Sequence, residues 1–178
     1  VLAACWDDTQ GRHHAGWLTV QGPAARPTVR VQRSVELPTR GHGLALLPDG
    51  DLLVVARRPG DWLLRLPAQP TRPVQWHWLE PGRVTSGHVL PGPDGRTVFT
   101  TEISSDTDQG LLCLRDARSL EKRAEFETQG HDPHAVSWFP VSSTGAAAHP
   151  LAGMLVVANG GIATTPETGR VKQHLVAM

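Results

Sequence analysis

Three histidines recur in this chain at a fixed interval. His42, His88 and His134 are separated by 46 residues in both intervals. Three imidazoles that converge on one point can bind a transition metal such as iron, copper or zinc and leave a coordination position open for solvent. Two other hypotheses stay open. Each histidine could instead hydrogen-bond a neighbouring backbone carbonyl and stabilise a corner of its repeat, or the three could share no role.

A second group of polar residues follows the apolar runs of the sequence. Arg57 and Arg58 end one run, Thr101 and Glu102 end the next, and Asn159 ends a third. Polar residues that end an apolar strand often line a binding site, and paired arginines bind carboxylate or phosphate groups through charge-assisted hydrogen bonds. We therefore treat these five as candidate ligand-binding residues. The alternative is a structural ion pair between repeats, such as Arg58 with Glu102.

No catalytic motif is present. The segment 159–161, Asn-Gly-Gly, lacks the Gly-Lys-Ser/Thr ending of a phosphate-binding loop. A Gly-x-Ser-x-Gly nucleophile elbow is also missing. Cys5 and Cys113 have no Cys-x-x-Cys spacing, so they form either one disulfide or two free thiols. The sequence therefore favours a binding or scaffold role over an enzyme.

The three histidines belong to an internal repeat. Residues 41–56 and 87–100 both read Gly-His, an apolar stretch, Pro-Asp-Gly and a β-rich run, and residues 133–159 hold a weaker copy with a Ser/Gly/Ala-rich insertion. Pro sets the backbone of a turn, Asp bonds to it locally and Gly accepts positive φ. Each copy therefore predicts a β-hairpin.

The period predicts the fold class. A repeat near 46 residues suits a four-stranded propeller blade, which typically takes about 40–50 residues. We expect an all-β partial β-propeller of three to four antiparallel four-stranded blades. It forms a single domain over residues 1–178, with repeats at roughly 37–82, 83–129 and 130–168. Within residues 116–126 we expect an Asp turn and then a strand, although a short helix is the alternative. A ring that does not close leaves sheet edges unpaired, which predicts association with a second copy or another protein.

Charge and hydropathy exclude several partners. Lys plus Arg and Asp plus Glu are equal at 17 each, so no basic footprint for nucleic acid is present. The apolar runs are too short to span a bilayer. Trp76 and Trp78 flank His77 and lie on one face of a predicted strand. We expect them in the core between sheets, with a stacking platform for carbohydrate as the alternative.

Several motifs together resemble a known family. They lie at residues 37–43, 55–60, 94–102, 133–134 and 155–162, and they are similar to the bacterial family built on domain of unknown function 1513. The resemblance implies a WD40/YVTN-like propeller protein about twice as long as this chain, which corresponds to its N-terminal half. It also implies twin-arginine export to the periplasm and genes near imelysin-type and di-haem peroxidase-like proteins of iron-related clusters.

The chain departs from that family's pattern at two places. The family usually has Gly after the histidine where this chain has Val89, and Asn-Asp after the glutamate where it has Ile103-Ser104. The expected function is a periplasmic binding or scaffold module in iron-related processes. The alternatives are a redox accessory or enzyme that holds a metal or cofactor with the histidine trio, and a structural remnant without a site.

Overall fold

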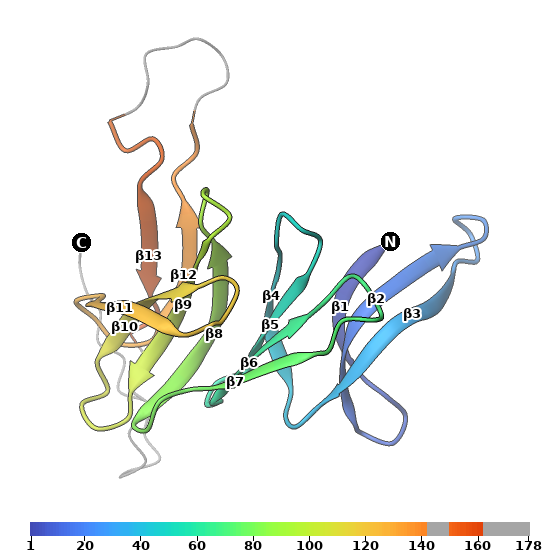
Figure 1. Ribbon diagram of the computed structural model, residues 1–178, viewed down its shortest axis with the longest axis horizontal. Helices are drawn as coiled ribbons and strands as arrows, with labels where there is room; N and C mark the ends of the chain where they lie inside the picture. The colour runs from blue at the N-terminus through green and yellow to red at the C-terminus, as the bar shows by residue number, and fades with distance from the viewer. Residues whose placement is uncertain (142–149, 162–178) are drawn as a thin grey trace.

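The computed structural model describes residues 1–141 and 150–161, and every regular element in these ranges is a β-strand (Figure 1). The first sheet has the order β1-β2-β3 and consists of β1 (Leu2–Asp7), β2 (His13–Gln21) and β3 (Thr28–Leu37). The second has the order β4-β5-β6-β7 and consists of β4 (Gly41–Leu46), β5 (Leu52–Ala56), β6 (Trp62–Leu66) and β7 (Gln75–Trp78).

The third and fourth sheets continue the same plan. The third has the order β11-β10-β9-β8 and consists of β8 (Arg83–Pro91), β9 (Thr97–Ser104), β10 (Gly110–Asp116) and β11 (Lys122–Glu127). The fourth pairs β12 (Pro133–Trp138) with β13 (Leu155–Asn159). All pairings are antiparallel. The insertion at 142–149 and residues 162–178, including the end of the third expected repeat, lie outside the described residues.

The first strand of each sheet lies next to the first strand of the following sheet. Contacts join β1 to β4, β4 to β8 and β8 to β12. Each is the edge strand of its own sheet, and we call these four the inner strands (Figure 1). This arrangement of successive antiparallel sheets around their inner strands confirms the predicted all-β, propeller-type fold class. Among the described residues there is no helix that could cross a membrane.

The predicted turns are confirmed. Gly50 and Gly95 close the two Pro-Asp-Gly turns with φ of 84° and 65°, and Asp94 Oδ1 accepts hydrogen bonds from the backbone N–H groups of Arg96 and Thr97. The stretch at 116–126 is a turn followed by strand β11, as expected, because Asp116 Oδ1 accepts the N–H groups of residues 118 and 119. Local side-chain bonds of this kind favour a turn over a helix.

Two apolar cores lie on either side of the second sheet. Every residue of β5 is buried, because successive side chains of a strand point to opposite faces. Leu52 and Val54 face a core shared with the first sheet. Leu53 and Val55 face a core shared with the third sheet. The third sheet contacts the fourth through an edge-to-face pair of aromatic rings, Phe99 and Trp138, with centroids 5.5 Å apart.

Candidate functional site

The fold brings the three repeated histidines together. The His88 ring lies edge-on between the other two, with its centroid 5.1 Å from that of His42 and 5.1 Å from that of His134. We call these three side chains the histidine row. It crosses three successive inner strands, β4, β8 and β12. His88 is half-buried, whereas His42 and His134 are exposed, so solvent reaches the row from both ends.

Each histidine of the row lies in a β-bulge. The register of β4 shifts between Gly41 and Leu44, that of β8 between Thr85 and Val89, and that of β12 between Pro133 and Ala135. A bulge bends the strand and redirects the side chain that it contains. Each bulge therefore interrupts the alternation of side chains between the two faces of the sheet at its histidine.

Two glycines allow the strands that carry the row to approach closely. A Cβ at Gly43 would lie 2.5 Å from the carbonyl oxygen of Gly87. Gly87 itself has a φ of 96°, and a Cβ there would lie 2.8 Å from Cδ2 of His42. Only glycine fits both positions without displacing its neighbours. The close approach of the two strands thus explains why Gly43 follows His42 and Gly87 precedes His88.

Two histidines of the row, His42 and His88, have lowered pKa values. Burial, and then the neighbouring His42 and His134 rings, lower the pKa of His88 to about 4. The pKa of His42 is also lowered, first by burial and then by His134 and the guanidinium groups of Arg57, Arg58 and Arg40. At neutral pH these two imidazoles therefore keep a free nitrogen lone pair.

Within residues 1–141 and 150–161, the ring nitrogens of the row have no hydrogen-bond partner. Nε2 of His88 is buried and without a hydrogen bond, and no ring nitrogen of His42 or His134 is hydrogen-bonded in the part of the chain that the structure describes. The hypothesis that these histidines stabilise repeat corners through backbone carbonyls is therefore not supported. In the same residues no group of three or more His, Cys, Asp or Glu side chains is arranged to hold a metal ion. Metal binding by the row remains a prediction that requires the rings to turn.

A buried carboxylate lies behind the row. Asp132 is 1% exposed; its Oδ1 accepts a hydrogen bond of 3.0 Å from Ser86 Oγ and pairs with the guanidinium of Arg58. The other oxygen, Oδ2, is buried without a partner, and a Cβ at Gly160 would lie 2.5 Å from it. Arg58, a candidate site residue that follows β5, is thus ion-paired with Asp132, which precedes β12 of the fourth sheet.

Glu102 lies in a different place from Arg58. Its carboxylate is fully buried between the second and third sheets, where Oε1 is 2.9 Å from Nη2 of Arg115. Arg115 is itself fully buried and also reaches Glu80 Oε2 at 3.1 Å and His77 Nε2 at 2.9 Å. We call these four residues the Arg115 cluster. The expected ion pair of Arg58 with Glu102 is wrong, because each residue pairs with another partner.

The remaining candidate residues are also dispersed. Thr101 is fully buried, and its hydroxyl accepts the backbone N–H of His88 at 3.3 Å. Asn159 ends β13 and bonds both to the carbonyl and to the hydroxyl of Thr128. Arg57 is exposed beside the row, and no ion pair or hydrogen bond of its side chain is found among the described residues. Of the five candidates, Arg57 and Arg58 are the two whose charges lower the pKa of His42. Thr101 bonds to the backbone of His88.

Asp132 and Ser86 were not among the expected site residues, although the repeat contains a signal for them. They stand two residues before His134 and His88 respectively, so they are one repeat apart, and their side chains bond to each other. The third member of this series is Arg40. A search for polar residues at fixed offsets from the histidines would have found the set.

The two tryptophans of β7 share a face as predicted, with rings 18° from parallel and centroids 6.5 Å apart. Trp76 also packs edge-to-face against the buried Trp62. Trp78, however, is 55% exposed, so the expectation that both lie in the core is wrong for this ring. The reason is that β7 is the outer edge strand of its sheet.

The fold and the histidine row together define a propeller-type protein whose repeated polar side chains gather on its inner strands. The chain belongs to the family described as "Protein of unknown function (DUF1513)", whose model matches residues 35–178. The resemblance inferred from the sequence motifs is thereby confirmed.

Comparisons with curated proteins and with solved structures do not indicate a function. No curated protein matches the chain. Among solved structures it is similar to "Dihydro-heme d1 dehydrogenase NirN in complex with DHE", with 19% identity and a TM-score of 0.46, over 70% of this chain and 27% of that one. A similarity of this degree says nothing about a shared activity.

Proposed function

We propose that this chain is a binding module and that the histidine row is its ligand site. The observation that supports this proposal is the buried, unpartnered Nε2 of His88 between two exposed imidazoles. A buried polar atom without a partner costs about 1–3 kcal/mol, and a bound ligand that reached it would recover that cost. The absence of catalytic motifs from the sequence favours binding over catalysis.

The charges around the row favour an anionic ligand. Arg40, Arg57 and Arg58 are close enough to lower the pKa of His42. Asp132 offsets one of them through its pair with Arg58, and Asp7 lies 3.7 Å from the guanidinium of Arg40. Arg57 is exposed and is the cation left for a ligand. A bare metal dication is repelled by such cations, but carboxylate or phosphate groups are attracted to them. An iron ion carried by a carboxylate chelator offers both a metal for the imidazoles and anionic groups for the arginines.

The setting we propose is the periplasm, in iron-related processes, with a protein partner that the module supports as a scaffold. The family resemblance of the motifs favours this setting. Unpaired sheet edges and the exposed apolar side chains of β3, Val29 and Val31 at 63% and 50%, favour contact with a second copy or another chain.

A second candidate function is a redox accessory or enzyme in which the row binds a transition metal or cofactor directly. The lowered pKa of His88 favours it, because a metal ligand must be a neutral imidazole. In that case the three rings would have to turn so that one nitrogen of each points to a common metal position.

The test is a set of calorimetric titrations with ferric citrate, Zn²⁺ and Fe²⁺. The wild-type chain is expected to bind ferric citrate, and His88→Ala and Arg57→Ala are each expected to weaken binding at least tenfold. His13→Ala is the matched control, because His13 pairs with Asp7 on the first sheet, outside the row. Binding of Zn²⁺ or Fe²⁺ alone that depends on His88 but not on Arg57 would favour the second candidate. No binding of any of the three would overturn the row as a ligand site.

A further inference from the structure

The second and third sheets enclose a groove between them, at the opposite end of their strands from the histidine row. His42 and His134 lie near the beginnings of β4 and β12, whereas the groove is formed by the turns that follow β4, β6, β8 and β10. Its volume is about 670 Å³, which lies within the range of roughly 300–1,000 Å³ that small-molecule sites occupy. Nothing in the histidine row contributes to it.

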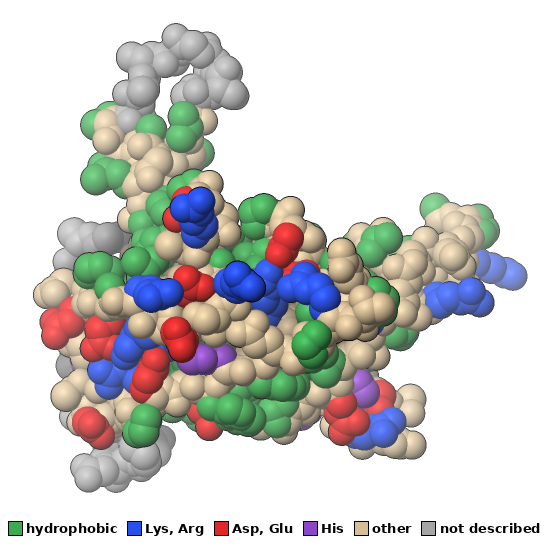
Figure 2. All heavy atoms as spheres, in the orientation of Figure 1, with side chains coloured by type: hydrophobic (Ala, Val, Ile, Leu, Met, Phe, Trp, Pro, Cys, Tyr) green, Lys and Arg blue, Asp and Glu red, His purple; other side chains and the backbone are tan. Residues whose placement is uncertain are grey.

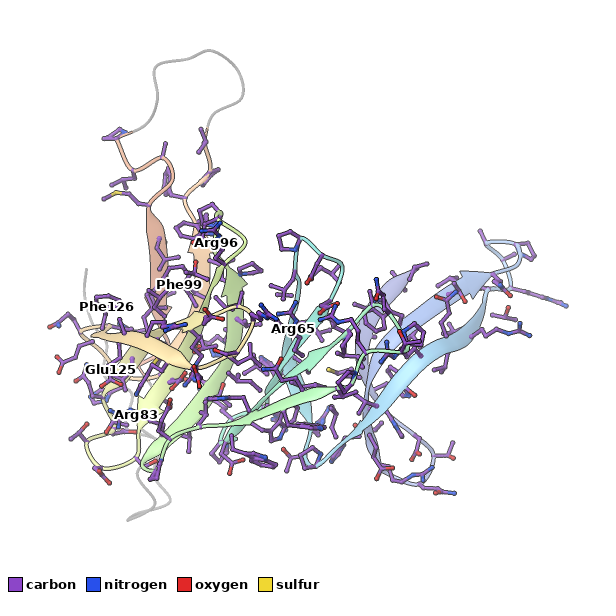
Figure 3. The ribbon with its side chains drawn as sticks, in the orientation of Figure 1. Arg65, Arg83, Arg96, Phe99, Glu125 and Phe126 are labelled. Carbon is purple, nitrogen blue, oxygen red and sulfur yellow. The ribbon has the colours of Figure 1, made fainter. Side chains whose placement is uncertain are left out.

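Arginines dominate the lining of this groove. Four are present: Arg65, Arg72, Arg96 and Arg118. Figure 2 shows basic side chains gathered across the middle of the visible face, with acidic ones among them. Figure 3 shows Arg65 between the two four-stranded sheets and Arg96 at the turn between β8 and β9.

The carboxylates near the groove are already engaged. Asp51 is fully buried and pairs with Arg65 at 2.7 Å and with Arg72 at 2.9 Å. Asp49 also pairs with Arg65, and Asp116 Oδ2 pairs with Arg123 at 3.0 Å. These bonds leave the acidic groups of the lining with partners of their own.

Arg96 and Arg118 are different. Both are exposed at the groove, and neither guanidinium has an ion pair or hydrogen bond among the described residues. A guanidinium offers five N–H donors in a planar fork, which matches a carboxylate or phosphate. Two such groups beside an apolar floor that includes Leu47 and Ala117 make a site for a ligand with at least two anionic groups.

The backbone holds the two free arginines in place. The N–H of Ala117, next to Arg118, donates to the carbonyl of Arg96 at 2.8 Å. On the other side, the carbonyl of Ala117 accepts a bond of 2.7 Å from Nη1 of Arg65, a side chain that is 8% exposed. Gly95 adds a further constraint, since a Cβ there would lie 3.2 Å from Pro48 of the neighbouring turn. The site is therefore built into the contact between sheets and needs no rearrangement of the backbone.

We propose that this groove is a second ligand site, specific for small polyanions with several carboxylate or phosphate groups. Arg96 and Arg118 bind the anionic groups directly, and Arg65 and Arg72 form the base of the site. The inference is independent of the histidine row, because no residue is shared between the two places.

The experiment is isothermal titration of the wild-type chain with inorganic pyrophosphate and, separately, with tricarballylate, at low ionic strength. At least one probe is expected to bind, and the double variant Arg96→Ala/Arg118→Ala is expected to weaken it at least tenfold. The double variant Arg96→Lys/Arg118→Lys keeps the charge without the planar fork, and we expect an intermediate affinity. The difference between the two probes shows whether phosphate or carboxylate is preferred.

The matched control is Arg26→Ala/Arg30→Ala, which removes the same charge from exposed positions on the first sheet. Equal losses in the control and the groove variant would overturn the proposal in favour of general charge attraction. No binding of either probe to the wild type would also overturn it. Thermal unfolding of each variant verifies that the fold is retained, and the row variant His88→Ala should bind both probes as the wild-type chain does.

Discussion

The histidine row and the Arg115 cluster are both groups of polar side chains where neighbouring sheets meet, but their bonding differs. In the Arg115 cluster a fully buried guanidinium contacts two carboxylates and an imidazole. In the row, the His88 ring contacts the rings of His42 and His134, and the nitrogens of all three bond to nothing in the described residues, with His88 Nε2 buried. Ion pairs join the second and third sheets in the cluster, although Glu102 Oε2 is also buried without a hydrogen bond. The row has no such pairing, and its imidazoles are available to a ligand.

The largest effect that would test this comparison is the loss of Arg115. Arg115→Ala leaves Glu102 as a buried charge without its partner, and breaking a buried pair in this way typically costs about 3–5 kcal/mol. Urea unfolding should show this decrease in the free energy of unfolding. Arg123→Ala is the control: its 3.0 Å pair with Asp116 is exposed, so the loss should stay below about 1 kcal/mol. Similar losses for both would contradict a structural role of the cluster.

A smaller loss should follow from crowding the row. Gly43→Ala would place a Cβ 2.5 Å from the Gly87 carbonyl oxygen, and strain of this kind usually costs about 1–3 kcal/mol. The same substitution should also weaken any ligand of the row, because β4 and β8 must move apart. Leu46→Ala, at an exposed position of the same strand, should change the free energy of unfolding by about 0.5 kcal/mol or less. An unaffected Gly43→Ala variant would mean that the strands are not held at this distance.

The pH dependence of the free energy of unfolding tests the burial of His88 in the histidine row. The pKa of His88 falls from 6.5 to about 4 on folding, mainly through burial. Between these values the unfolded chain binds a proton that the folded chain does not, so stability decreases as the pH falls from about 6.5 to about 4. His42 and His77 act in the same direction.

Unfolding by urea at several pH values provides the measurement. His88→Gln should reduce the slope in this window, whereas Leu46→Ala, which removes an exposed side chain without a titratable group, should leave it unchanged. A slope that His88→Gln does not alter would show that the ring titrates like an exposed imidazole.

The smallest perturbation uses thiols as reporters of access. Cys113 is fully buried beside the cluster, and burial, followed by the nearby Glu102, raises the pKa of its thiol. Burial also raises the pKa of Cys5 to about 11. Both are free thiols. Cys113 should not react with a maleimide at neutral pH until the chain unfolds, and the half-buried Cys5 should react slowly. A cysteine introduced by His42→Cys at the exposed end of the row should react at once. Fast labelling of Cys113 in the folded chain would show that the interface between the sheets opens to solvent.

The sequence contained more of the fold than of the site. A 46-residue interval and two Pro-Asp-Gly turns were enough to predict antiparallel sheets stacked around inner strands, because turns and alternation are local properties. The same interval predicted that the three histidines meet. The charged pairs could not be predicted in the same way, because they depend on the offset between neighbouring sheets. Glu102 was grouped with Arg58 by its place in the repeat, yet its side chain faces the second sheet and Arg115. Trp78 is exposed because β7 is an edge strand, which the alternation of residues 76–78 does not reveal.

Strand β5 has a consequence for how the molecule unfolds. Its five residues alternate between two cores, so Val54 and Val55, neighbours along the chain, report on different sheet contacts. Substitutions at the two positions act on separate interfaces, but both interfaces depend on this one strand. Such a shared strand joins what would otherwise be independent modules into a single cooperative unit. Amide hydrogen exchange in β5 should therefore proceed only through global unfolding, even where the outer strands of the same sheet open locally.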